Sequence, residues 1–265
     1  MEDALLYLYT GINVFMLIIA RMIGLFIVSP IFGRNNIPAI MKITLCLFIS
    51  YLIFPSVIGM SFDIDFYNMN TMLVILYGIK EFVVGLSIGF IAYIMFGIFF
   101  MAGSYLDMEM GLSMATMFDP QYGGQVPLSG NLIYIYATLI FLVIDGHHYL
   151  IKILVNSFQL FPLDGILKFD GNFLDFTINL VNFIFFMSLK LIIPIFVGLV
   201  ITNIVLGFLA RTMPQMNIFV VGVQVKIVIG LGLLIILTPF MVSQFKTVFM
   251  TMYKYMYEYL RIIRG

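Results

Sequence analysis

The sequence predicts an all-α, polytopic membrane protein made of long, kinked helices and helical hairpins. Hydrophobic residues make up 63% of the 265 residues and charged residues only 10%, whereas a soluble domain carries about 25% charged residues. The apolar residues are also gathered in six stretches, each near or above the roughly 20 residues that cross about 30 Å of hydrocarbon. Most of the chain must therefore face lipid or other apolar protein surfaces.

The six stretches follow one another along a chain that we treat as a single integral membrane domain, residues 1–265. The third and the fifth are longer than one crossing needs, so each must tilt, kink or extend beyond the lipid. Pro194 in the fifth and Pro239 near the end of the sixth predict bends, because proline lacks an N–H and its ring clashes with the preceding turn. The stretches are residues 12–32, 40–62, 71–102, 131–155, 177–210 and 217–245.

The third stretch carries glycines near one helix face. Gly78, Gly85 and Gly89 recur at a spacing that brings them close together around the helix. Because small residues let two helix backbones approach closely, we expect this face to pack tightly on a neighbouring helix.

The basic residues give contradictory signals about topology. Arg34 and Lys42, in the first connection, favour a cytoplasmic loop and an external N-terminus. Six full crossings would then place the C-terminus outside, although its basic residues favour the cytoplasm. Either one apolar stretch is not a simple span, or an assembly overrides the rule for single chains. The basic residues of the C-terminal end are Lys246, Lys254, Arg261 and Arg264.

Several charged residues lie inside apolar stretches, where each unpaired charge costs at least about 2.5–3.5 kcal/mol. Lys80 and Glu81 are adjacent and point about 100° apart on a helix, so we expect their partners on other helices or other chains. Alternatively, some of these segments protrude from the membrane and the charges are hydrated. The charged residues in question are Arg21, Lys80, Glu81, Lys190 and Lys226.

The sequence offers little for enzymatic or nucleic-acid chemistry. There is no nucleotide-binding P-loop and no H-E-x-x-H motif. The spacing G-x-S-x-G occurs at Gly85–Gly89, but inside the third apolar stretch and not at the strand-to-helix turn that a hydrolase nucleophile needs. The 13 basic and 13 acidic residues balance, which leaves no positive field for nucleic acid. Cys46 is the single cysteine, so no disulfide forms within the chain. His147 and His148 are adjacent and poor candidates for one metal site, and Asp145 with His147 forms either a proton relay or an ordinary polar helix end. We expect no enzyme activity, cofactor or metal.

The connection over residues 103–130 is unusually long and rich in glycine and methionine. Connections between two spans are usually shorter, which favours a functional or re-entrant segment over an ordinary surface loop. Both interpretations remain open from composition alone.

Four motifs, read in order, resemble the FliR family and its injectisome relatives, the T subunits of virulence type III secretion. Gly222 favours the flagellar branch, whereas Val223-Gln224 departs from the family's usual apolar residue and proline. The first motif is Ser29-Pro30-Ile31-Phe32-Gly33 with Ile37-Pro38 and Lys42; the second is Asp107-x-x-x-Gly111 with Phe118-Asp119-Pro120 and Gln125-x-Pro127; the third is Asp145-Gly146-His147-His148 with Ser157 and Pro162; the fourth runs from Arg211 through Pro214 to Phe219, with Gly222 and Lys226.

The resemblance implies a non-enzymatic subunit of the flagellar type III protein-export gate in the bacterial inner membrane, within the flagellar basal body. It implies one copy of the chain, assembled with several copies of FliP and FliQ into a conical channel for unfolded flagellar proteins. FlhB and FlhA would be further partners. Such a cone, partly raised out of the bilayer, would explain the buried charges and the contradictory topology signals.

The resemblance also implies that residues 106–127 form a plug in the channel, and the flexible side chains of methionine and the conformational freedom of glycine suit that role. Three rival readings stay open: an injectisome T subunit, a scaffold without gating, and a secondary transporter that uses the intramembrane charges. The expected plug residues are Asp107, Met110, Gly111, Met114, Met117, Phe118, Asp119, Pro120, Gln125 and Pro127. The expected subunit contacts are Arg21, Lys80, Glu81, Lys190, Arg211 and Lys226.

Overall fold

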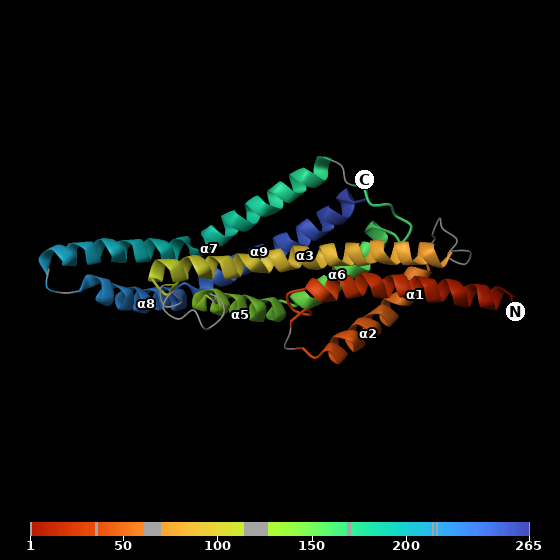
Figure 1. The fold of residues 1–265 in the computed structure, drawn as a ribbon, viewed down its shortest axis with the longest axis horizontal. Helices are drawn as coiled ribbons and strands as arrows, with labels where there is room; N and C mark the ends of the chain where they lie inside the picture. The colour runs from red at the N-terminus through yellow and green to blue at the C-terminus, as the bar shows by residue number, and fades with distance from the viewer. Residues whose placement is uncertain are drawn as a thin grey trace. The chain divides into compact units, whose positions relative to one another are not determined.

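The fold is all α in the part of the chain that the structure, a computed structural model, describes (Figure 1). That part comprises residues 2–34, 37–60, 70–113, 127–168, 171–213, 215 and 217–264. Its helices are α1 (Glu2–Val28), α2 (Ala39–Ile58), α3 (Thr71–Met110), α5 (Leu128–Val143), α6 (Gly146–Leu160), α7 (Gly171–Thr212), α8 (Ile218–Ile236) and α9 (Thr238–Ile262).

Four of these helices are long and apolar enough to cross a membrane, and up to six spans result if each bent helix pair counts as one. The prediction of an all-α, polytopic membrane protein is therefore confirmed. The fourth predicted stretch is bent by 69° between α5 and α6, and the sixth by 65° between α8 and α9. Each is thus a broken span or a re-entrant segment, and neither is the simple crossing that the topology argument assumed.

The two breaks have different local causes. Asp145 lies between α5 and α6 with a φ of 57°, a left-handed conformation that a right-handed helix cannot contain. Pro239 is the second residue of α9, a first-turn position where its missing N–H has no helical partner to lose. The predicted bend near Pro239 is confirmed. Helix α7 stays helical through Pro194, and Figure 1 shows that it changes direction partway along its length.

Helices α3 and α7 are longer than the predicted stretches 71–102 and 177–210. They contain 40 and 42 residues, which corresponds to about 60 Å at 1.5 Å per residue, roughly twice the hydrocarbon thickness. Each must tilt strongly or extend beyond the lipid.

The helices group into two compact units. The first comprises Met1–Ile94, Asp145–Leu180 and Thr251–Gly265, and the second comprises Met95–Ile144 and Val181–Met250. Helices α3, α7 and α9 each continue from one unit into the other. That residues 1–265 form a single domain stays a prediction.

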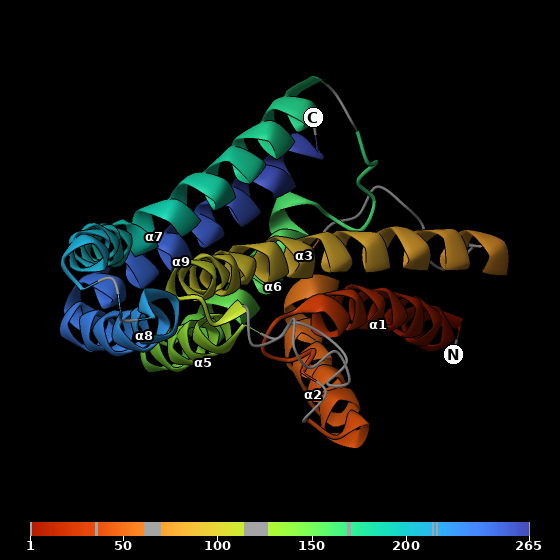
Figure 2. The ribbon, with the colours of Figure 1, turned by 60° about the vertical axis from the view of Figure 1, so that its left-hand side comes forward.

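In the first unit, α1 packs side by side with the N-terminal part of α3 (Figures 1 and 2). A Cβ atom at Gly85 would overlap the backbone of Arg21, and one at Gly89 would lie 2.9 Å from the carbonyl oxygen of Leu25. Residue numbers rise in the same direction along both helices, so α1 and α3 run parallel. The expected close packing is confirmed at Gly85 and Gly89 but not at Gly78, where nothing lies within 4 Å.

The second unit is built on an aromatic core. Fully buried phenylalanines of α3, α5 and α9 meet there with ring centroids 4.7–5.8 Å apart. Edge-to-face contacts of this kind add to the stabilisation that comes from removing large apolar area from water. The rings belong to Phe96, Phe99, Phe141, Phe245 and Phe249.

Candidate functional site

The base of the 103–130 connection is held together by a carboxylate at the end of α3. Asp107 is 2% exposed, and its two carboxylate oxygens accept hydrogen bonds from the backbone N–H of Ser129 at 3.1 and 3.0 Å. Ser129 lies in the first turn of α5, whose N–H groups have no partners inside the helix. Asp107 therefore caps α5, and its negative charge interacts favourably with the positive end of the helix dipole.

Two glycines allow the helices to meet at this point. A Cβ atom at Gly103 would overlap the backbone of Gly130, and one at Gly130 would lie 3.0 Å from the carbonyl oxygen of Phe100. The backbones of α3 and α5 are thus in direct contact. Together with the cap at Ser129, this contact fixes the two ends of the connection next to each other.

The last residues of α3 also contact α7 and α8. Met110 is fully buried, and a Cβ atom at Gly230 would overlap its sulfur. The next residue, Gly111, has a φ of 82° and lies against Val223. Because this conformation strains any residue that has a Cβ atom, glycine is needed where the chain leaves α3.

Polar contacts complete the base. The side-chain nitrogen of Asn203 on α7 donates a hydrogen bond to Glu109 Oε1 at 2.6 Å, and Lys226 Nζ on α8 donates to the Glu109 carbonyl oxygen at 3.4 Å. The end of α3 is therefore joined to α5, α7 and α8 within the second unit. We refer to Gly103, Asp107, Glu109, Met110, Gly111, Ser129 and Gly130 as the loop base.

The structure places the predicted plug residues in two groups. Asp107 and Met110 are buried in the loop base, Gly111 begins the connection, and Pro127 occupies the N-cap position of α5. Sequence reasoning did not assign Ser129 or Gly130 to this site; the small size of both residues, just inside the helix that follows Pro127, is the only local signal for the close contact. The remaining predicted residues, Met114, Met117, Phe118, Asp119, Pro120 and Gln125, lie outside the described residues.

In the first unit, Arg21 and Glu81 form a fully buried ion pair between α1 and α3. Arg21 also donates hydrogen bonds to Ser157 Oγ at 2.9 Å and to the Phe161 carbonyl oxygen at 3.0 Å. Its guanidinium lies 4.1 Å from the ring centroid of Phe158. The ion pair, two further oxygen acceptors and an aromatic face together offset the desolvation of the arginine.

Lys80 extends the same network towards the end of α6. Its Nζ lies 3.2 Å from Glu81 Oε1 and donates hydrogen bonds to the carbonyl oxygens of Leu163 and Gly165 at 2.5 and 2.9 Å. Both residues have the expected partners outside α3, which are Arg21 for Glu81 and the two carbonyl oxygens for Lys80. Lys80 also pairs with Glu81, which we did not expect, because the long lysine side chain reaches back to the carboxylate. We call Arg21, Lys80 and Glu81 the charge cluster.

The other predicted charges lie elsewhere. Lys190 and Arg211 are exposed on α7, and Lys226 is half-buried at the loop base. Asp145 pairs with His148 Nδ1 at 3.4 Å and not with His147, as a relay would require. Ligand atoms of Asp145, His147 and His148 lie within 4.8 Å of one another. We expected the two adjacent histidines to point apart, but their ring nitrogens lie close together.

Comparison with known proteins identifies the family. Residues 12–252 match the family described as "Bacterial export proteins, family 1". The flagellar biosynthetic protein FliR of Bacillus subtilis (strain 168) is 35% identical over 225 residues, 84% of this chain and 85% of the relative. FliR of Escherichia coli (strain K12) is 28% identical over 228 residues, 86% and 85% of the two chains. The secretion system apparatus protein SsaT of Salmonella typhimurium is 29% identical over 160 residues, 60% and 62%. The chain therefore belongs to the bacterial export protein family that contains the flagellar biosynthetic protein FliR, as its motifs predicted.

Proposed function

We propose that the chain is a non-enzymatic subunit of the flagellar type III protein-export gate and lines the path that unfolded flagellar proteins take across the inner membrane. The family match over residues 12–252 carries this proposal. Flagellar relatives match 84–86% of the chain, whereas the injectisome protein SsaT matches 60%. This difference favours the flagellar branch.

Within this proposal, the chain is present as one copy assembled with FliP, FliQ, FlhB and FlhA in the basal body. Its surface chemistry supports an assembled state, because many large apolar side chains of α2 and α7 are exposed. Ile40 is 78% exposed, Phe186 66% and Phe208 69%. Exposed apolar area of this extent marks contact with lipid or with other protein chains.

The connection that starts at Gly111 and ends at Pro127 would act as the plug of the closed gate. The loop base supports this role, since it ties both ends of the connection to α3, α5, α7 and α8. A connection whose two ends are fixed can move out of the channel and back into it while the surrounding helices keep their packing. Methionines in such a segment would seal around varied side chains and yield to an arriving substrate.

Removing residues 114–125 from the chain in the assembled gate tests the plug. This deletion keeps Asp107, Met110 and Ser129, so every described contact of the loop base remains available. We expect normal assembly and a raised ion conductance of the resting gate. Replacing residues 114–125 with a Gly/Ser segment of equal length is the control for chain length, and it should leak as well. An unchanged conductance in both variants would refute the plug role.

The rival readings make different predictions. A secondary transporter would need the intramembrane charges to line a solute path, yet Arg21 and Glu81 are 0% exposed and contact protein groups only. Uptake of a small solute by the single purified chain in vesicles would support that rival. A scaffold without gating would show neither leak nor altered secretion when Met114 and Met117 are replaced by alanine, whereas a plug would leak.

A further inference from the structure

The first family motif builds a turn at the end of α1 that the export role does not explain. The N–H of Ser29 donates a hydrogen bond to the Leu25 carbonyl oxygen at 2.9 Å, and the N–H of Gly33 donates to the Ser29 carbonyl oxygen at 2.7 Å. Phe32 stacks on Phe26 with ring centroids 4.6 Å apart. A Cβ atom at Gly33 would lie 2.6 Å from the Ser29 carbonyl oxygen, so this compact turn requires glycine.

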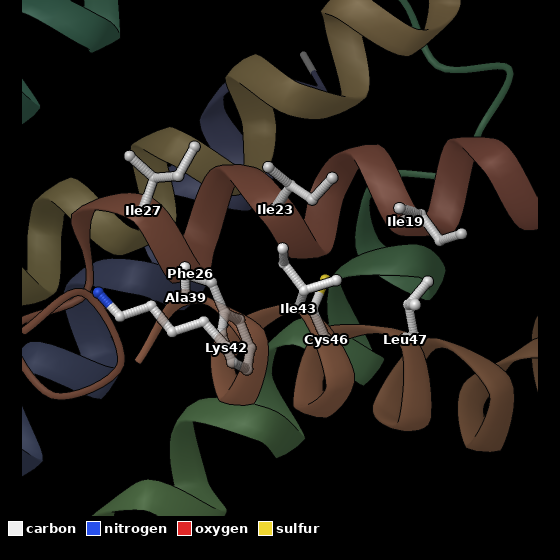
Figure 3. A pocket seen from close by; sticks show the side chains of 9 residues that line it. All are labelled: Ile19, Ile23, Phe26, Ile27, Ala39, Lys42, Ile43, Cys46 and Leu47. Atoms are coloured by element: carbon white, nitrogen blue, oxygen red, sulfur yellow. The ribbon is translucent and has the colours of Figure 1, made fainter. Parts of the chain in front are cut away.

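Beside this turn, α1 and α2 enclose an apolar groove. In Figure 3, Ile19 of α1 and Ile43 and Leu47 of α2 lie around an apolar hollow between the two helices. The volume of this hollow is about 330 Å³. A second hollow of about 730 Å³ shares Phe26 and Lys42 with the first, but the rest of its α2 lining lies on the other side of that helix. The two volumes fall in the range of about 300–1,000 Å³ that is typical of small-molecule sites.

One cation lies where the two hollows meet. Lys42 lines both, and it is the only charged residue among the described residues that line either. Its Nζ donates a hydrogen bond to the Gly33 carbonyl oxygen at 3.1 Å, which holds the ammonium beside the turn. An ammonium has three donors, and among the described residues only the Gly33 carbonyl oxygen accepts a hydrogen bond from Lys42, so Lys42 can also donate to a ligand. Arg34 follows Gly33 directly and adds positive charge to the same connection.

We propose that this groove binds an anionic phospholipid, with the phosphate on Lys42 and an acyl chain between α1 and α2. The hollow between α1 and α2 combines Lys42 with an otherwise apolar lining, which matches the charge and the apolar character of such a lipid. Basic pockets between transmembrane helices are known to bind anionic head groups. A neutral apolar helix from another protein would fill the groove but would leave the remaining Lys42 donors without acceptors. The proposal is independent of the plug.

The absence of tryptophan from the chain allows a test without background fluorescence. We suggest replacing Leu47 with tryptophan in the full chain and reconstituting it in phosphatidylcholine vesicles that contain brominated phosphatidylglycerol or brominated phosphatidylcholine, which quench tryptophan on contact. The control reporter replaces Ile193, which is 53% exposed on α7. At low salt we expect an approximately fivefold preference for phosphatidylglycerol at Leu47→Trp, corresponding to one lysine contact, and none at Ile193→Trp.

Variants of Lys42 separate charge from shape. Lys42→Gln should abolish the preference for phosphatidylglycerol, Lys42→Arg should retain it, and high salt should weaken it. If Leu47→Trp disturbs folding, Ile43→Trp reports on the same hollow. Equal quenching by the two lipids would overturn the proposal, because the groove would then hold any acyl chain. Loss of quenching by both lipids in the assembled gate would also overturn it, because another protein chain would then occupy the groove.

Discussion

Replacing Glu81 with glutamine tests how strongly the charge cluster stabilises the first unit. The substitution preserves the size of the side chain and its oxygen acceptor but removes the negative charge that pairs with Arg21. Arg21 keeps its hydrogen bonds to Ser157 and Phe161, yet its charge becomes uncompensated at zero exposure. Breaking a buried ion pair in this way costs about 3–5 kcal/mol.

The two halves of the pair should be strongly coupled. Arg21→Met alone leaves Glu81 with Lys80 as its partner, whereas Arg21→Met with Glu81→Leu removes both buried charges. Because the double variant removes both charges of the pair, we expect it to lose at least about 2 kcal/mol less than the sum of Arg21→Met and Glu81→Leu measured singly.

Cys46 provides the assay, since it is the only cysteine and is 4% exposed. A thiol-reactive dye in detergent therefore reports thermal unfolding of the first unit without further labelling. We expect the midpoint to fall on the order of 10 °C for Glu81→Gln. Asp175→Asn, which removes an exposed carboxylate from α7, is the matched control. If Glu81→Gln is as stable as this control, the charge cluster does not hold α1, α3 and the end of α6 together.

Two further substitutions test the helix contacts. Gly85→Ala should destabilise the first unit by about 1–3 kcal/mol because its Cβ atom overlaps the α1 backbone. The control Gly78→Ala, with open space around it, should leave the unfolding midpoint reported by Cys46 unchanged. Equal effects of the two substitutions would argue against close α1–α3 packing. Asp107→Ala should destabilise the start of α5 by about 1–2 kcal/mol through loss of the cap at Ser129, detected as faster proteolysis within residues 103–130, and an unchanged rate would contradict the capping role.

Hydrophobic length predicted the helices well but could not predict where two of them break. The stretch at 131–155 is continuously apolar up to Asp145, and hydropathy contains no information on its left-handed backbone. Pro239 carried a local signal, and the bend was predicted there. Pro194 carried the same signal, and there α7 stays helical while it changes direction along its length (Figure 1).

The sequence showed that buried charges need partners but not which partners. Glu81 lies 60 residues from Arg21, and Ser157 lies 136 residues away, so only the fold brings them together. The roles of Asp107 and Met110 changed for a similar reason. The glycine- and methionine-rich composition of residues 103–130 suggested exposed, flexible side chains, whereas Asp107 and Met110 are both buried in the loop base.

Purifying the chain from its native membranes tests whether it is a subunit of the export gate. With an affinity tag on this chain and quantitative mass spectrometry of the isolated complex, the export-gate account predicts one copy of the chain with several copies of FliP and FliQ. Recovery of the chain alone, or of a homo-oligomer that transports a small solute, would contradict it.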